Sequence, residues 1–327
     1  MWDISQFYDF DLRRESQDIV GKNGIFKYLY SNRNLQNSNL LNTTLSKSGF
    51  TAVINHKGAE LISLQDDCGK EYIWEGNPEF WGKHSPVLFP IVGTLKNNSY
   101  QYENREYQLP RHGFARDLEF EVANRTDHEV TFSLQSNAET LAQYPFPFEL
   151  QLIYTLTESG LTIGYRVLNQ GDLAMPFSIG AHPALALPGH FEDYALQFDQ
   201  SENPTYHLLE NDLISDHTRK ISLDNGKLPL NYELFANDAL VFKTLESQSV
   251  TITKNDKPVV SIAFGAFPNL GIWTKPGAPF ICIEPWFGYA DTLTASGNLF
   301  EKEGIQILGP HGNFETKFRI LMPQAAR

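Results

Sequence analysis

The sequence predicts an all-β protein, a large and mostly antiparallel β-sandwich. Apolar and polar residues alternate with a period of two in many short segments, as they do in strands that bury one face. The connections between these segments hold turn residues, and most are too short for a parallel crossover, which needs about a dozen residues. No amphipathic helix of about 12 residues or more, and no repeat of about 20 to 50 residues, interrupts the pattern.

The first 45 residues differ from the rest of the chain. The stretch SNRNLQNSNLLNTT, residues 31–44, is polar, rich in asparagine and nearly aperiodic, which is typical of poorly ordered segments. We therefore expect a poorly ordered N-terminal extension over residues 1–45 and one β-sandwich domain over residues 46–327.

The strand-like segments follow in order along the predicted domain. In residues 160–170, Leu161, Ile163 and Tyr165 fall on one face, whereas Thr162 and Arg166 fall on the other. The same alternation occurs in residues 51–65, 129–136, 148–157, 239–245, 249–265 and 316–322. Stretches with Asn, Asp or Gly at residues 66–70, 96–99, 169–172 and 254–257 supply the turns.

Two further segments carry weaker signals. Residues 76–83 predict a short helix, because Asn77 could cap it and Pro78 would take its first position. Residues 190–236 are loosely patterned and are expected to form an excursion over one face of the sandwich.

Composition limits the classes of partner. The net charge is −13 and no basic run interrupts it, so binding to a nucleic-acid backbone is not expected. Two cysteines, Cys68 and Cys282, cannot form a disulfide framework or a cysteine-based zinc site. The N-terminus carries charges where a signal peptide needs an apolar core, and no segment is long and apolar enough for a membrane span. We expect a cytoplasmic protein, monomeric or homodimeric, without nucleic-acid or membrane partners.

Three stretches place an ionisable residue among Gly, Pro and aromatic residues. They are PRHGFARD with His112, SIGAHPALALPG with His182, and FICIEPWFGYAD with Glu284. Glu284 is expected to end a strand that is apolar on both faces, where a carboxylate is costly unless it is paired or used. Taken singly, each residue is explained at least as well by a structural role: a paired buried carboxylate for Glu284, a satisfied core histidine for His182, or a solvated loop for His112. Together they suit acid–base chemistry on an uncharged polar substrate such as a sugar ring.

Five stretches in this order resemble the aldose 1-epimerase family, also called galactose mutarotases, and in particular its LacX-like bacterial branch. They are WGKHSPVLFPIVG, PRHGFARDLEF, SIGAHPAL, NDALVF and IEPWFG, and the resemblance runs from about residue 46 to the C-terminus. It implies a β-sandwich of the galactose mutarotase type, no cofactor, and interconversion of the α and β anomers of a hexose.

The resemblance also implies roles for individual residues. It places the general base on Glu284, the general acid on His182 and a second active-site histidine on His112. It places a residue that binds sugar hydroxyls on Asp238.

Substrate recognition departs from the family pattern at one position. The family often has an arginine just after FPIVG, where this chain has Thr94. Arg111 is the expected replacement for part of that contact, and Trp286 is expected to supply a flat apolar wall.

Three alternatives stay open at this point. The two histidines and Glu284 could hold a metal, although such sites usually contain two ligands close together in sequence. The substrate could be a phosphorylated hexose, for which Arg111, Arg116, Lys83 and Lys96 are candidate ligands. The chain could also be a non-catalytic sugar-binding or regulatory protein on the same fold.

Overall fold

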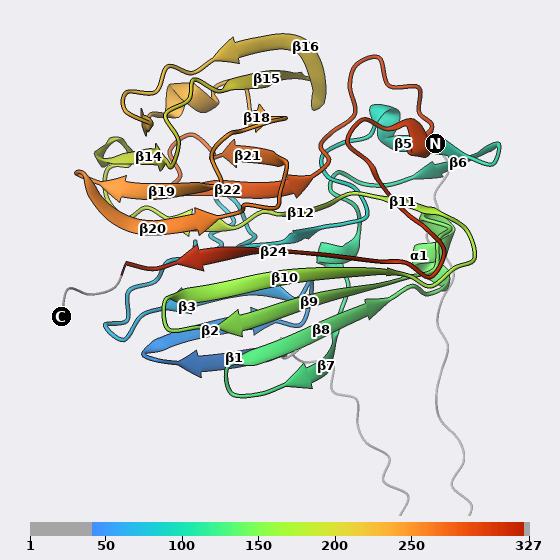
Figure 1. Ribbon diagram of the computed structural model, residues 1–327, viewed down its shortest axis with the longest axis horizontal. Helices are drawn as coiled ribbons and strands as arrows, with labels where there is room; N and C mark the ends of the chain where they lie inside the picture. The colour runs from blue at the N-terminus through green and yellow to red at the C-terminus, as the bar shows by residue number, and fades with distance from the viewer. Residues whose placement is uncertain (1–40, 324–327) are drawn as a thin grey trace, which may run out of the picture. The chain divides into compact units, whose positions relative to one another are not determined.

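The computed structural model describes residues 41–323 (Figure 1). Two large sheets dominate this region, and all pairings between their strands are antiparallel. In order across the first, nine-stranded sheet lie β17 (Lys227–Pro229), β14 (Tyr194–Phe198), β19 (Ser249–Lys254), β20 (Lys257–Ala263), β24 (Asn313–Leu321), β10 (Gly160–Asn169), β9 (Phe148–Leu156), β8 (Glu129–Gln135) and β7 (Glu121–Arg125).

The second, eight-stranded sheet carries the residues of greatest interest. In order it contains β16 (Leu213–Lys220), β15 (Thr205–Glu210), β18 (Leu240–Phe242), β21 (Asn269–Trp273), β22 (Phe280–Phe287), β12 (Ile179–Ala181) and β4 (Val87–Leu88), and β13 (Ala184–Ala186) also pairs with β22. One hydrophobic core joins residues of both sheets, for example Leu150 and Ile163 from the first with Ile281 and Ile283 from the second. This packing of two antiparallel sheets is the predicted sandwich.

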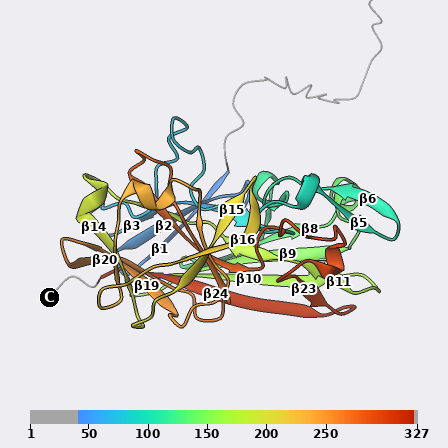
Figure 2. The ribbon, with the colours of Figure 1, turned by 90° about the horizontal axis from the view of Figure 1, so that it is seen from above.

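Smaller elements complete the described region. A three-stranded sheet contains β1 (Asn42–Lys47), β2 (Phe50–Asn55) and β3 (Glu60–Gln65), and two further pairs are β5 (Ser99–Tyr102) with β6 (Arg105–Gln108) and β11 (Met175–Phe177) with β23 (Gln306–Leu308). The β5–β6 hairpin lies at the opposite end of the sheets from the β19–β20 hairpin (Figures 1 and 2).

Helical structure is sparse in this region. The helices are α1 (Ala138–Gln143) and the single-turn 3₁₀ segments η1 (Lys96–Asn98), η2 (Ala115–Asp117), η3 (Phe191–Asp193), η4 (Tyr232–Phe235) and η5 (Leu299–Glu301). Among the residues that the structure describes, no helix has the length and apolar character needed to cross a bilayer.

Most of the predicted strands are confirmed. The seven segments correspond to β2 with β3, β8, β9, β10, β18, β19 with β20, and β24. In β10 the side chains of Leu161, Ile163, Tyr165 and Val167 are all buried, as the alternation predicted. The predicted extension over residues 1–45 lies outside the described residues as far as residue 40, and its last residues belong to β1, which begins at Asn42.

Two predictions about this region are wrong. Residues 190–236 contain four strands of the two large sheets, β14 to β17, instead of an excursion. Because β16 lies at a sheet edge and most of its residues are exposed, its sequence does not alternate between apolar and polar residues. Residues 76–83 form only a turn, in which Asn77 Oδ1 accepts a hydrogen bond from the Glu79 N–H. Phe80 and Trp81 pack against other aromatic rings there instead of continuing a helix.

Candidate active site

The candidate site lies on the face of the eight-stranded sheet that points away from the main core. Side chains alternate along β22, so Ile281 and Ile283 enter the core while Cys282, Glu284 and Trp286 face the other way. The prediction that Glu284 ends its strand is wrong, because β22 continues through Pro285, which pairs with Leu270.

The register of neighbouring strands brings further residues to the same face. Gly271 lies opposite Glu284, Trp273 opposite Cys282, and Gly180 opposite Trp286. A Cβ atom at Gly271 or Gly180 would overlap the indole of Trp286, so these two glycines make room for the ring. The indole N–H donates to the Ala181 carbonyl oxygen at 3.2 Å, which fixes its orientation.

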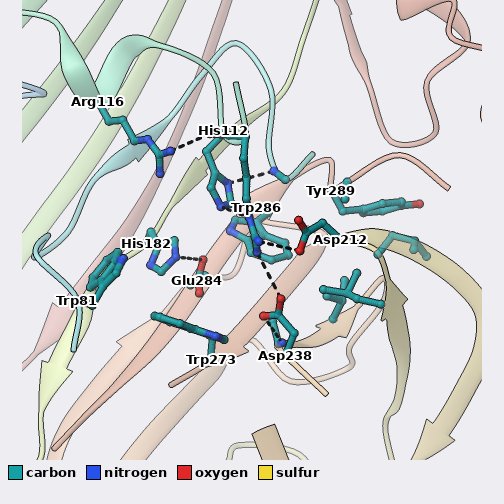
Figure 3. Close-up of a pocket in the computed structure, with 17 residues that line it drawn as sticks. Trp81, His112, Arg116, His182, Asp212, Asp238, Trp273, Glu284, Trp286 and Tyr289 are labelled. Carbon is teal, nitrogen blue, oxygen red and sulfur yellow. Dashed lines mark hydrogen bonds and ion pairs between the residues drawn. The ribbon is translucent and has the colours of Figure 1, made fainter. Parts of the chain in front are cut away.

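A cleft of about 380 Å³ opens above this face (Figure 3). That volume falls within the range of about 300 to 1,000 Å³ that is common for small-molecule sites. Its walls combine aromatic rings with ionisable groups, and they are Trp81, Gly93, Arg111, His112, Arg116, His182, Leu209, Asp212, Ile214, Asp238, Ala239, Val241, Trp273, Glu284, Trp286, Tyr289 and Ala290.

A buried histidine–carboxylate pair lies at the base of the cleft. His182 Nε2 is 3.3 Å from Glu284 Oε2, and the two residues are only 7% and 1% exposed. Burial raises the pKa of Glu284 well above its ordinary value, and burial lowers the pKa of His182 to about 3. Both shifts favour a neutral pair that holds one proton, on the carboxyl group, while the cleft is empty.

Two tryptophans hold the imidazole of His182. Trp81 stacks on it with ring centroids 4.7 Å apart, and Trp273 meets it edge-on at 5.8 Å. His182 Nδ1 is buried and has no hydrogen-bond partner among the described residues. The ring is therefore positioned by aromatic packing and by its contact with Glu284.

His112 reaches the cleft from a tight turn and presents a hydrogen-bond donor. Burial and the nearby His182, Arg111 and Arg116 keep its pKa well below 6.5, so the ring is neutral and carries one N–H. Its Nδ1 accepts from the Gly93 N–H at 3.1 Å, which assigns the proton to Nε2. The Arg111 Nε–H points at that nitrogen from 3.3 Å, a longer contact that is a hydrogen bond only when the ring proton lies on Nδ1.

The turn that carries His112 depends on Gly113. The Gly113 N–H donates to the Pro110 carbonyl oxygen, and His112 and Gly113 both have positive φ, 68° and 70°. A Cβ on Gly113 would overlap the backbone carbonyl of Phe89. Position 113 therefore needs a residue that adopts positive φ and has no Cβ atom, and only glycine meets both requirements.

Gly113→Ala is therefore expected to lower the free energy of unfolding by about 2 to 4 kcal/mol, because strain and a backbone clash add together. Chemical denaturation measures this change. Gly69→Ala is the control, since Gly69 also has positive φ but a Cβ added there would meet nothing within 4 Å. If both substitutions lower the free energy of unfolding by the same amount, the clash with the Phe89 carbonyl does not contribute to the loss.

Arg111 lies between two carboxylates at the mouth of the cleft. Its Nη1 lies 3.1 Å from Asp212 Oδ1, and its Nη2 lies 3.7 Å from Asp238 Oδ2. Arg116 donates from Nη2 to the backbone carbonyl of Arg111 at 2.8 Å. Figure 3 shows Asp212 and Asp238 on the side of the cleft opposite Trp81.

The structure brings all six predicted site residues to this one cleft. Glu284, His182, His112, Arg111, Asp238 and Trp286 line it together. Thr94 does not line it, and its hydroxyl is buried without a hydrogen-bond partner among the described residues. Of Thr94 and Arg111, only Arg111 is placed to contact a ligand in the cleft.

Sequence reasoning missed three important residues. Trp81 lies in a family-like stretch that predicted no role for it, and Trp273 ends a strand that was not predicted. Asp212 lies in the turn of the β15–β16 hairpin, within the segment expected to be an excursion. The adjacent Asn211 and Asp212, a pair that favours two-residue hairpin turns, were the available signal.

The predicted metal-site alternative gains little from the geometry. Among the described residues, His182, Cys282 and Glu284 have potential ligand atoms within 4.8 Å of one another, and His112 does not belong to this group. Burial raises the pKa of the Cys282 thiol well above its ordinary value, which disfavours the thiolate that metals bind. This donor set fits a resident metal ion poorly.

Comparison with known proteins gives consistent matches. Residues 42–306 match the sequence model of the aldose 1-epimerase family. The chromosomal protein LacX of Lactococcus lactis subsp. lactis is 37% identical over 259 residues, which cover 75% of this chain and 86% of that protein.

Two solved structures are also similar. A galactose mutarotase related enzyme from Lactobacillus acidophilus is 33% identical with a TM-score of 0.83, and the match covers 87% of this chain and 98% of that one. A galactose mutarotase-like protein from Lactobacillus casei ATCC 334 is 30% identical with a TM-score of 0.80, covering 86% and 100%. The predicted sandwich type is confirmed by these likenesses.

Proposed function

Because the chain belongs to the aldose 1-epimerase family and is therefore a mutarotase, we propose that it interconverts the anomers of a free, uncharged hexose in the cleft that contains Glu284. The observation that carries this proposal is the buried pair of His182 and Glu284, 3.3 Å apart, at the base of a cleft with aromatic walls. A matched acid and base is what ring opening of a hemiacetal requires.

The proposed reaction begins when the sugar binds over the pair. Sugar hydroxyls and the charge of Arg111 favour the carboxylate form of Glu284, so its proton passes to His182 Nε2. Glu284 then removes the proton from the anomeric O1 while His182 gives its proton to the ring oxygen O5. The C1–O5 bond breaks, and O1 becomes the aldehyde oxygen.

This step returns the pair to its neutral state. Glu284 is again protonated and His182 again neutral, which are the forms that burial favours. Rotation about C1–C2 presents the other face of the aldehyde, and the reverse transfers close the ring as the other anomer. The buried setting therefore stabilises the state with the open-chain sugar.

The remaining residues bind and orient the substrate. His112 Nε2–H donates to the region of the ring oxygen and stabilises the charge that develops there. Arg111 and Asp238 bind hydroxyl groups, and Trp286 with Trp273 supplies flat walls for the apolar faces of the ring.

The phosphorylated-hexose alternative is weaker because the cations near the cleft are already paired. Arg111 faces two carboxylates, and Arg116, which also lines the cleft, has an ion pair of 3.7 Å with Asp117. Lys83 pairs with Asp117 at 2.9 Å, and neither Lys83 nor Lys96 lines the cleft. A phosphate dianion would need two or more available cationic donors.

Other parts of the assignment rest on sequence. We propose a cytoplasmic location, which the two free cysteines, Cys68 and Cys282, support. Its assembly as a monomer or homodimer and its lack of nucleic-acid or membrane partners stay predictions. A non-catalytic sugar-binding protein would have no need of an acid matched to a base.

Two-dimensional exchange NMR of glucose, galactose and glucose 6-phosphate, with and without the protein, tests the proposal. We expect faster exchange between the anomers of at least one free hexose and little effect on glucose 6-phosphate. Folded protein that binds a sugar without speeding its exchange would favour the non-catalytic alternative.

The pH dependence of the reaction should reflect the shared proton. The active pair holds one proton, gains a second at acid pH and loses its last at alkaline pH. Burial lowers the pKa of His182 to about 3 and raises that of Glu284. The pair therefore keeps its single proton over a wider pH range than an exposed histidine and carboxylate would. We expect kcat/KM for a free hexose to stay level between about pH 5 and pH 7. An acid limb with its midpoint near 6.5, the ordinary value for histidine, would contradict this account.

A further inference from the structure

We infer that Asp212 is a specificity-determining residue, which orients the Arg111 guanidinium toward the bound sugar and makes the cleft mouth unfavourable to anionic sugars. This inference rests on the proposed mutarotase function and extends it to the turn of the β15–β16 hairpin. Asp212 contacts none of the atoms expected to react, so its effect is on binding and selection.

The hairpin holds Asp212 in a defined place. Glu210 pairs with Leu213, so Asn211 and Asp212 form a two-residue turn with φ values of 51° and 65°. These values are typical of the type I′ turn, which matches the twist of the flanking strands.

The strand after the turn is anchored to the loop that follows β22. The Ile214 N–H donates to the Asp291 carbonyl oxygen at 2.8 Å, and the Leu293 N–H donates to the Ile214 carbonyl oxygen at 3.1 Å. Ile214 itself is buried and lines the cleft. The backbone beside Asp212 therefore cannot move without breaking these hydrogen bonds.

Two carboxylates together fix the orientation of Arg111. Asp212 contacts Nη1 and Asp238 contacts Nη2, which turns the Nε–H edge toward His112. Without Asp212, only the longer contact of 3.7 Å to Asp238 would orient the guanidinium from this side. The contact of 3.3 Å between Arg111 Nε and His112 Nε2 would then be held less firmly.

The same carboxylate sets the charge of the cleft. Of the described residues that line it, Arg111 and Arg116 are positive, Asp212 and Asp238 are negative, and the His182–Glu284 pair is neutral as a unit. The four separate charges cancel. Loss of the Asp212 charge would leave a net positive cleft and free Arg111 Nη1 for a phosphate oxygen.

An ion pair between partly exposed side chains commonly contributes little to stability, so Asp212 could simply be a surface residue. Arg111 and Asp212 are 42% and 52% exposed. A purely structural role would leave the choice between neutral and anionic sugars unchanged, and that choice is what the experiment measures.

The test compares Asp212→Asn with the native protein on a free hexose and on its 6-phosphate. For the free hexose, we expect KM to rise about threefold with kcat nearly unchanged, as for loss of an exposed charge contact. We expect the ratio of kcat/KM for the free hexose to that for the phosphate to fall about fivefold or more. This difference between the two proteins should shrink at high salt, since added ions screen exposed charges.

Asp216→Asn is the matched control, because it removes the same charge from an exposed position on the adjoining strand β16, outside the cleft. It should keep the native ratio. An unchanged ratio in Asp212→Asn, or an equal change in both variants, would overturn the inference.

A binding measurement separates this inference from the proposed function. Trp81, Trp273 and Trp286 line the cleft, so tryptophan fluorescence can report sugar binding without turnover. Failure of the native protein to speed any anomer exchange would refute the function alone. In that case the affinity of Asp212→Asn for glucose 6-phosphate relative to glucose must still be about fivefold higher than that of the native protein; an equal ratio of affinities in the two proteins would refute the inference.

Discussion

Glu284→Gln is expected to lower kcat for anomer exchange of a free hexose by about a thousandfold or more. Glutamine has nearly the same shape but cannot accept the O1 proton, and it cannot supply the proton that makes His182 an acid. Both halves of the reaction therefore fail together. Polarimetry of a freshly dissolved single anomer measures the change directly.

The same substitution should leave the fold intact or make it more stable at neutral pH. Burial raises the pKa of Glu284 in the folded state above its unfolded value. Such an acid contributes its full stability only below the unfolded pKa, and that contribution is lost as pH rises through the folded pKa. The amide stays neutral throughout, so Tm at pH 7 should be equal or higher. Near-native turnover, or a large fall in Tm, would contradict the assignment.

His182→Asn is expected to lower kcat by about a hundredfold to ten-thousandfold, the usual range for one positioned proton transfer. The variant loses the proton donor to O5 but keeps Glu284, and aromatic contacts of Trp81 and Trp273 with the ring are lost as well. His217→Asn is a suitable control, because the His217 side chain is 76% exposed and lies outside the cleft. It should keep native kcat.

A double variant distinguishes a coupled pair from two independent residues. Groups that act as one unit give strongly non-additive effects, so Glu284→Gln with His182→Asn should be little worse than the more severe single variant. If the loss in kcat of the double variant equals the product of the two single losses, the residues act separately and the shared-proton mechanism is wrong.

The sequence predicted the strands whose two faces differ most. The β10 strand alternates from Leu161 to Asn169, since one face enters the core and the other is partly exposed. Strands β15 and β16 gave no such signal because β16 forms the sheet edge and β15 lies next to it, and neither has a continuously buried face. The turn at residues 78–80 resembles a helix start in sequence because its capping residue, Asn77, behaves in the same way in both structures.

The sequence identified those site residues whose type does not suit the surrounding sequence. A carboxylate inside an apolar strand drew attention to Glu284, and Gly and Pro beside histidine drew attention to His112 and His182. Asp212 does not stand out in this way, because an acidic residue is common in a turn. Its distance of 3.1 Å from Arg111 is a tertiary contact between the β15–β16 hairpin and a segment 101 residues away, which no local pattern predicts.

The tertiary structure adds the electrostatic state of the site. The pKa shifts of Glu284 and His182 follow from complete burial, which depends on β12, β21 and β22 packing together. Similarly, the assignment of the His112 proton to Nε2 depends on the N–H of Gly93, a residue 19 positions away. Neither fact can be derived from the motifs alone.

In the proposed mechanism, the Glu284–His182 pair exchanges protons with O1 and O5 of a free hexose. Exchange NMR of one hexose with equal amounts of native protein and Glu284→Gln, both shown to be folded, is the decisive experiment. We expect rapid exchange between the two anomers with the native protein and the uncatalysed rate with the variant. Equal acceleration by both proteins would show that Glu284 is not the base, and the mechanism proposed for this cleft would be wrong.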